Sequence, residues 1–244
     1  CNSLVEIIIP KNVTEIKNEA FAFCTKLKKI EISEGVKTFN NNLFRDCYTL
    51  TTVKIPNSVT DIYGSVFYNC IGLLEMFIPE NVKYLESGIF QSCKNLKSLS
   101  VAETNLVYDS RNNCNAIIRK KDDALVVGIK TSVIPEDVKS ITGLAFAVVP
   151  IKSITIPASV TDIGNWCFSS CLALSEIKIK ATTAPHLGNF VFGQHSYNFT
   201  GYNTHKDGVN KLYVPAGATG YDSGQWLDPL CNADKCGFTI SYTL

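Results

Sequence analysis

The chain carries ten cysteines and three histidines in 244 residues, and such side chains can form disulfides, hold a metal ion or attack a substrate. Half of the cysteines follow a regular spacing of 23 residues, namely Cys1, Cys24, Cys47, Cys70 and Cys93. A zinc site needs ligands that converge on one point, but an even spacing distributes them along the chain. The spacing therefore favours packing over chemistry.

A later cysteine, Cys171, holds the same place in its own repeat, and Val149 fills that place once. Free cysteine packs as a small apolar side chain. We therefore predict a structural column of free thiols, with stacked disulfides as the alternative, and its members are Cys1, Cys24, Cys47, Cys70, Cys93 and Cys171.

The four remaining cysteines lie outside this column. Cys231 and Cys236 bracket a short polar stretch, and they are a candidate disulfide in an exported protein. Cys114 and Cys167 are expected to be packed in the interior.

All three histidines, His186, His195 and His205, fall between residues 180 and 210, near Asp207. They could share a metal ion, but their irregular spacing and the lack of a helix to fix them favour ordinary loop histidines. No Ser-His-Asp order, glycine-rich phosphate loop or carboxylate pair stands out. We therefore predict no catalytic, metal or cofactor site, and a protein that is not an enzyme.

The same interval of 23 residues governs the apolar residues that would position any site. One column consists of Phe21, Phe44, Phe67 and Phe90, and another consists of Leu4, Leu27, Leu50, Leu73 and Leu96. The repeated unit is I-P-x-x-V-x-x-I-x-x-x-A-F-x-x-C-x-x-L-x-x-I-x. A fixed period of this length is typical of a leucine-rich repeat solenoid.

We predict a right-handed repeat solenoid, α/β or mainly β, with one parallel strand per coil, short 3-10 or helical turns on the opposite side, and a C-terminal cap. Stretches such as "KKIEIS" alternate apolar and polar residues, as half-buried strands do. Parallel strands stacked in sequence order are expected at 28–32, 51–55, 74–78, 97–101, 152–156 and 175–179.

The whole chain, 1–244, is expected to form one domain. Its parts are N-terminal repeats at 1–101, a hairpin insertion at 102–133, further repeats at 134–179, and an irregular last coil with a cap at 180–244. The insertion is read from "NAIIR" and "ALVVGI" on either side of the polar "KKDD". Because the chain starts in mid-repeat, we expect it to be a piece of a longer protein whose signal region lies outside this sequence. A lipid anchor at Cys1 is disfavoured by its place in the thiol column.

Composition narrows the classes of partner. The chain is 45% hydrophobic with a net charge of +1, so it can bury a core but shows no basic footprint for nucleic acid. No run of 18 apolar residues is present, so no membrane span is expected in this fragment.

The polar positions of the strands point outward and form two ladders on the sheet. Most of these residues suit a solvated sheet with cross-strand charge pairs such as Glu31 with Lys54, but Phe77 and Ile8 are apolar. Extended faces of this kind bind ligands in repeat proteins. The candidate ligand-binding residues are Lys29, Glu31, Thr52, Lys54, Glu75, Phe77, Ser98, Ser100, Ser153, Thr155, Glu176 and Lys178.

The repeated unit, together with "YDSRNNCNAII" and "ATTAPHLG…LYVPAG", resembles the BspA-like, or Treponema pallidum-type, leucine-rich repeat of bacterial surface proteins, particularly those of Bacteroides-like gut bacteria. This resemblance implies export to the cell surface or secretion. It also implies a protein without a catalytic motif, with host extracellular matrix proteins among the partners. Our first hypothesis for the function is a non-catalytic adhesion module that binds a protein or glycan through the sheet face or the inserted hairpin. The alternative is a structural spacer that displays an N-terminal domain absent from this sequence.

Overall fold

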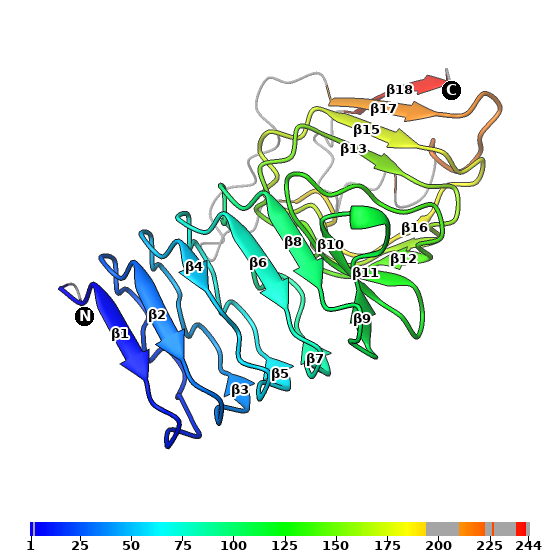
Figure 1. The fold of residues 1–244 in the computed structure, drawn as a ribbon. Helices are drawn as coiled ribbons and strands as arrows, with labels where there is room; N and C mark the ends of the chain where they lie inside the picture. Colours follow the sequence, from blue (N-terminus) through cyan, green and yellow to red (C-terminus); the bar gives the residue numbers. More distant parts are fainter. Residues whose placement is uncertain (2, 194–209, 223–225, 227–237, 243–244) are drawn as a thin grey trace.

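The computed structural model describes residues 1, 3–193, 210–222, 226 and 238–242. The chain winds into coils that stack one after another from the N-terminus to the C-terminus (Figure 1), and this confirms the predicted repeat solenoid. Regular coils contribute a strand to a front sheet and also a two-residue strand to a back ladder, which the sequence pattern did not indicate.

The strands of the front sheet are parallel and follow sequence order. They are β1 (Glu6–Ile9), β2 (Lys29–Ile32), β4 (Thr52–Val53), β6 (Glu75–Ile78), β8 (Ser98–Val101), β13 (Ser153–Ile156), β15 (Glu176–Ile179), β17 (Asn210–Val214) and β18 (Phe238–Tyr242). The back strands are β3 (Thr38–Phe39), β5 (Asp61–Ile62), β7 (Tyr84–Leu85), β12 (Ser140–Ile141), β14 (Asp162–Ile163) and β16 (His186–Leu187). Between the two blocks of coils lie β9 (Tyr108–Asp109), η1 (Arg111–Asn113), β10 (Ala116–Arg119) and β11 (Ala124–Gly128).

The front sheet is divided into three pieces, ordered β1-β2-β4, β6-β8 and β13-β15-β17-β18. The repeat interval sets the register, since Glu6 pairs with Lys29 and Ser153 with Glu176. The strand expected at 51–55 is reduced to two residues, and its ladder with β2 ends at the pair Ile30 and Val53. Within the described residues, no ladder joins β4 to β6. The sheet is therefore open at this point.

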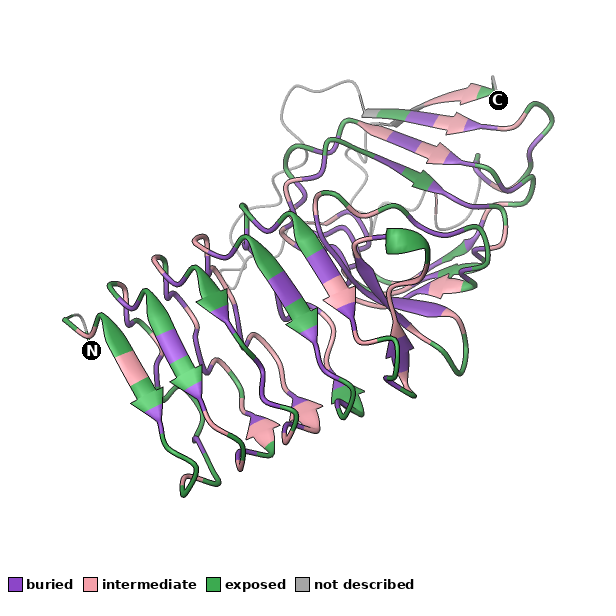
Figure 2. Cartoon of the chain, viewed as in Figure 1, coloured by how far each residue is buried: buried purple, intermediate pink, exposed green. Residues whose placement is uncertain are grey.

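Inward side chains form the core, and burial alternates along the front strands (Figure 2). The repeated phenylalanines stack ring on ring. Centroids are 5.8 Å apart for Phe21 and Phe44, 5.6 Å for Phe44 and Phe67, and 5.3 Å for Phe67 and Phe90. Because one coil cannot bury its own ring, each coil depends on its neighbours for its core.

The A-F-x-x-C segments form tight turns rather than continuous helix. In the first full coil, Ala22 N–H donates to Glu19 O at 2.9 Å and Cys24 N–H donates to Phe21 O at 3.2 Å, which is the i to i+3 pattern of a 3-10 turn. Glu19 and Phe23 have φ values of 61° and 59°, so the helical path stops at both. Phe23 N–H then donates to Arg45 O of the next coil at 2.7 Å, which joins neighbouring turns.

The hairpin between the two blocks of coils lies inside the molecule. β10 and β11 pair antiparallel, as the sequence predicts, and β11 also pairs parallel with β12 of the following coil. Ile117 and Val127 belong to the core of the preceding coils, whereas Ile118 and Leu125 belong to the core of the following coils. The hairpin therefore separates two hydrophobic cores.

Side chains of the insertion cover the last coil of the first block. Asn115 Oδ1 accepts a hydrogen bond from Leu99 N–H at 3.3 Å, and Ser110 Oγ accepts one from Val101 N–H at 3.0 Å. On the back ladder, the Tyr108 hydroxyl accepts from Leu85 N–H at 3.0 Å. These three side chains replace the next strand at both edges.

Candidate functional site

An open groove of about 710 Å³ crosses the front sheet over β2, β4, β6 and β8. Eight of the twelve predicted ligand-binding residues line it: Lys29, Glu31, Thr52, Lys54, Glu75, Phe77, Ser98 and Ser100. Their positions follow from the strand period, because every second side chain of a strand points to the same face. The structure therefore brings these residues together on one surface.

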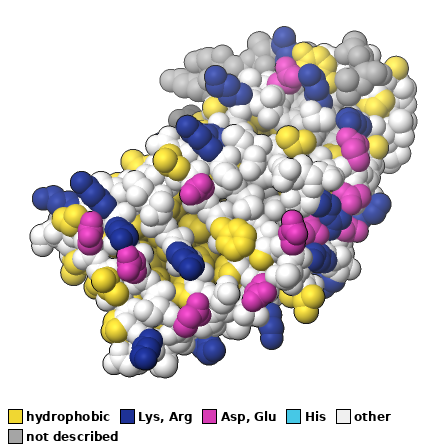
Figure 3. Space-filling model, in the orientation of Figure 1, with side chains coloured by type: hydrophobic (Ala, Val, Ile, Leu, Met, Phe, Trp, Pro, Cys, Tyr) yellow, Lys and Arg dark blue, Asp and Glu magenta, His cyan; other side chains and the backbone are white. Residues whose placement is uncertain are grey.

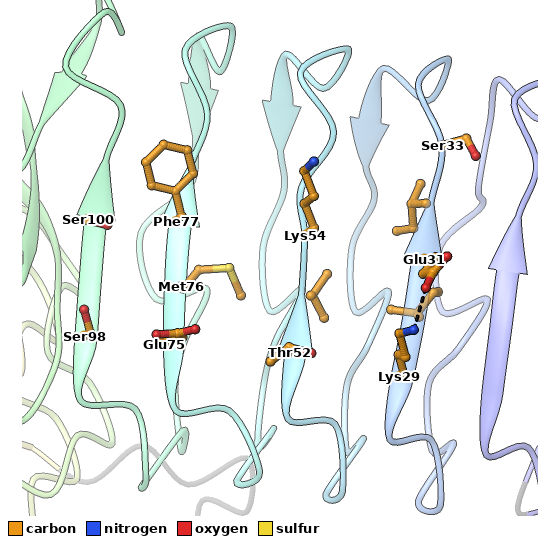
Figure 4. Close-up of a pocket in the computed structure, with 13 residues that line it drawn as sticks. Lys29, Glu31, Ser33, Thr52, Lys54, Glu75, Met76, Phe77, Ser98 and Ser100 are labelled. Atoms are coloured by element: carbon orange, nitrogen blue, oxygen red, sulfur yellow. Dashed lines mark ion pairs between the residues drawn. The ribbon is translucent and has the colours of Figure 1, made fainter.

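The side chains stand in two rows across the strands (Figure 4). Lys54 and Phe77 are neighbours in one row, and Thr52, Glu75 and Ser98 belong to the other. The Phe77 side chain is exposed to 54%, which is unusual for phenylalanine. Hydrophobic side chains gather in a hollow in the middle of this face, surrounded by charged ones (Figure 3).

The floor of the groove is apolar and was not predicted as part of the site. It is formed by Ile30, Ile32, Val53 and Met76, which are core residues, and Ser33 adds a polar group. These residues contribute because the ladder of β4 ends early and no strand pairing closes the sheet toward β6. Alternation along single strands carries no information about such an opening.

The prediction of a charge pair between Glu31 and Lys54 is wrong. Glu31 pairs instead with Lys29 of its own strand, with Nζ and Oε1 2.5 Å apart, and this hydrogen bond raises the pKa of Lys29. The reason is geometric: pairing of β2 with β4 ends one residue before Glu31. Within the described residues, neither Lys54 nor Glu75 has an ion-pair partner or a side-chain hydrogen bond.

The four other predicted residues lie on the separate sheet piece that begins at β13, away from the groove. They are Ser153, Thr155, Glu176 and Lys178. Lys178 forms an ion pair with Glu176 at 3.0 Å, and its ammonium lies 5.8 Å from the centroid of the Tyr213 ring. The two charged residues of this piece are thus already satisfied by their neighbours.

The two strands of the inserted hairpin present little exposed surface, and a role of the insertion in binding stays a prediction. All five residues of β11 and three of the four in β10 are buried, because each face of the hairpin covers one of the two cores. The exposed residues of the hairpin are Lys120, Lys121 and Asp122 of its turn, and Arg119 and Asp123 beside them are half-buried. The strands of the hairpin are therefore structural.

A second hollow of about 270 Å³ lies at the turns, beside Asn42, Arg45 and Tyr68. The Arg45 guanidinium lies 5.1 Å from the Tyr68 ring centroid, and its Nε donates to Asp46 Oδ2 at 3.2 Å. Because Arg45 is held by these neighbours, the hollow offers a ligand less than the groove does.

The cysteines of the predicted column are free thiols, and those from the second coil onward are buried. Each of four thiols donates a hydrogen bond of 3.0 Å to a phenylalanine carbonyl of the preceding coil. These pairs are Cys47 with Phe21, Cys70 with Phe44, Cys93 with Phe67, and Cys171 with Phe146. The thiols are therefore polar links between coils as well as apolar filling, a role that their spacing alone did not indicate.

In the four pairs, the phenylalanine lies 25 or 26 positions before the cysteine. At these distances before Val149 the chain has residues of the hairpin and no coil phenylalanine, so a thiol at position 149 would lack this acceptor. Burial raises the pKa of Cys47, Cys93 and Cys171 to about 12, so these thiols stay protonated and unreactive.

The remaining predicted cysteines differ in environment. Cys1 is exposed in this structure, contrary to expectation. Cys114 and Cys167 are buried and free, as expected. The candidate pair Cys231 and Cys236 lies outside the described residues.

No cluster of three or more metal-ligating side chains occurs in the part of the chain that the structure describes. His186 lies in β16 with Nδ1 3.7 Å from Asp162 Oδ1, and His195 and His205 fall outside the described residues. Within the same ranges, no helix has the length and apolar character of a transmembrane span.

Comparison with known proteins supports this architecture. A leucine rich cell surface protein from Faecalibacterium prausnitzii is 22% identical with a TM-score of 0.62, over 100% of this chain and 74% of its own. A leucine-rich repeat protein from Eubacterium ventriosum is 19% identical with a TM-score of 0.58, over 87% and 67% of the two chains. The pneumococcal vaccine antigen PcpA is 18% identical with a TM-score of 0.58, over 87% and 62%. At these identities the likeness concerns the fold.

A search of curated proteins finds no match. The family described as BspA type leucine rich repeat region matches six copies of its unit, over residues 1–117 and 126–206. Those ranges cover most of the chain and include both blocks of coils. The chain therefore belongs to the BspA type leucine-rich repeat family.

Proposed function

We propose that this protein is a non-catalytic binding module, exported to the bacterial surface or secreted, which recognises a protein or glycan through the groove on its front sheet. The observation that carries this proposal is the exposed Phe77 ring beside Lys54, over an apolar floor in an open part of the sheet. An exposed aromatic ring costs hydration free energy unless a partner covers it. Family membership and the surface protein among the structural relatives support an extracellular role.

The binding test uses the purified chain on surfaces that carry host matrix proteins such as fibronectin and fibrinogen, and on a glycan array. A double variant, Lys54→Glu with Phe77→Asp, should abolish binding, because it reverses the free charge and removes the ring. The matched control, Lys83→Glu with Tyr84→Asp, changes an exposed lysine and an exposed aromatic residue of the back ladder and should bind normally. Melting temperatures of both variants establish that each is folded.

If both variants lose binding equally, or if neither variant loses binding, the groove is not the binding site. No binding to any immobilised protein or glycan would instead favour a structural spacer. Surface exposure is tested separately with antibodies on intact cells that express the natural full-length protein. Labelling only after the cells are lysed would contradict export.

A further inference from the structure

We infer that the groove on the front sheet takes a neutral oligosaccharide, with one sugar ring stacked on Phe77. This inference rests on the proposed function and specifies the class of ligand. It follows from the electrostatics of the groove, from its mixture of hydrogen-bonding groups, and from its single exposed ring.

The charges of the groove cancel. Two lysines, Lys29 and Lys54, and two glutamates, Glu31 and Glu75, line it. Lys29 and Glu31 neutralise each other at 2.5 Å. Lys54 and Glu75 are one free charge of each sign, so a polyanionic ligand such as an acidic glycan would meet no excess of positive potential.

The free polar groups match the chemistry of sugar hydroxyls. A hydroxyl both donates and accepts hydrogen bonds. Lys54 offers only donors, Glu75 offers only acceptors, and Ser98 and Ser100 offer both. These four side chains surround Phe77 in the groove lining. A rim of hydroxyls can therefore use every free group, whereas a hydrocarbon surface would leave them without partners.

The aromatic ring matches the other part of a sugar. A pyranose has a face of C–H groups that can cover an aromatic ring, and its hydroxyls project around the edge. Phe77 supplies such a ring at 54% exposure, with Met76 and Val53 in the apolar floor beside it. An amphipathic helix would need a row of apolar anchors, but among the groove residues Phe77 is the one exposed large hydrophobic side chain.

The groove extends over four coils, and three strand spacings of about 4.8 Å give roughly 14 Å. That length suits a short linear oligosaccharide laid across the strands, so that successive sugars meet successive coils. Phe77 would then hold one unit, and the serines of β8 would contact the next.

The test is titration calorimetry of the whole chain with a panel of neutral oligosaccharides, namely maltotriose, cellotriose, mannotriose and N-acetyllactosamine, with sialyllactose as the acidic comparison. We expect at least one neutral sugar to bind at millimolar concentration. Phe77→Ala should weaken that binding about tenfold, as truncation of an interface aromatic does, and Phe77→Tyr should restore it. Tyr84→Ala, which removes an exposed aromatic ring from the back ladder, should leave it unchanged.

Three outcomes overturn the inference, and they separate it from the proposed function. If no neutral sugar binds, but an immobilised protein does so in a Phe77-dependent manner, the groove is a protein site and only the ligand class is wrong. If sialyllactose alone binds and Lys54→Ala abolishes this, the ligand is acidic. If neutral sugars bind equally to Phe77→Ala, they occupy another surface, and the groove fails as the sugar site while its role as a protein site remains to be decided by the double variant.

Discussion

At the scale of single residues, the cysteines show how one side chain can serve two purposes. Cys47 fills a fully buried position in the core, and its thiol also donates to the carbonyl of Phe21 one coil earlier. Valine can fill the space but cannot donate. It occurs in the chain at position 149, where no coil phenylalanine lies at the matching distance.

Replacement of Cys47 by alanine should lower the free energy of unfolding by about 1–2 kcal/mol at neutral pH, since a small cavity forms and the Phe21 carbonyl keeps its bond from Cys24 N–H. This deficit should shrink above pH 9 and then reverse in sign before pH 11, so that the alanine variant becomes the more stable protein. Burial raises the pKa of the Cys47 thiol to about 12 from its usual value near 9. The thiol's contribution to stability is complete below pH 9 and is lost as the pH rises towards 12, by about 1.4 kcal/mol per pH unit.

Urea unfolding of both proteins from pH 8 to 11 measures this difference. A difference that stays constant with pH would show that the folded thiol ionises normally. Val66→Ala is the control, because Val66 is fully buried but has no ionisable group, and its difference from the unmodified protein should stay constant with pH.

At the scale of elements, the insertion explains the segment "YDSRNNCN", which interrupts the repeat. Three side chains of this segment accept hydrogen bonds from backbone N–H groups that a further coil would otherwise bond. They belong to Tyr108, Ser110 and the final asparagine, Asn115. Arg111 ties the same segment to the turn of the hairpin and to the following coil, with bonds of 2.7 Å to Asp123 and Asp137. The motif is thus an edge cap built from side chains.

Tyr108→Phe should destabilise the protein by about 1–3 kcal/mol, because the buried Leu85 N–H loses its acceptor while the ring stays in place. Faster hydrogen exchange of the Leu85 amide, measured by NMR, would locate the effect. Tyr84→Phe is the matched control on the same ladder, since Tyr84 is exposed and no hydrogen bond to its hydroxyl is present in the described structure. Equal stability of Tyr108→Phe and the unmodified protein would refute the capping role.

The repeat columns and the inward and outward positions could be predicted from the sequence, because stacked coils place equivalent residues at equivalent sites. The burial of the hairpin was missed although a signal existed: "ALVVG" is a continuous apolar run, as in strands covered on both faces. The opening of the groove could not be predicted. The opening depends on the early end of the ladder between β2 and β4 and on the lack of a ladder between β4 and β6. The side chains of a single strand do not determine either feature.

At the scale of the whole molecule, the hairpin divides the interior into two cores that share one wall. Consecutive residues of β10 serve opposite sides, since Ile117 packs toward the first block and Ile118 toward the second. In a solenoid each unit contacts only its neighbours, so the effect of a substitution should decay with distance along the stack.

Two neighbouring substitutions test this arrangement. Ile117→Ala and Ile118→Ala should each cost about 2–5 kcal/mol locally, because each empties a buried site. Hydrogen exchange with mass spectrometry should show lost protection mainly in residues 30–101 for Ile117→Ala and mainly in residues 134–179 for Ile118→Ala. The same pattern of loss in both variants would mean that the molecule opens as a single cooperative unit.

The thiol and backbone links between coils also constrain how the gene for such a protein can change in length. Within a block, Cys70 bonds to Phe44 as Cys93 bonds to Phe67, so duplication or loss of one complete unit recreates every link at the new junction. A shorter insertion would break several links at once. The segment from Tyr108 to Gly128 has no such freedom, because its two faces match two different neighbours. Related proteins should therefore differ in the number of coils before and after this segment. Each should have one copy of the segment between two blocks of coils.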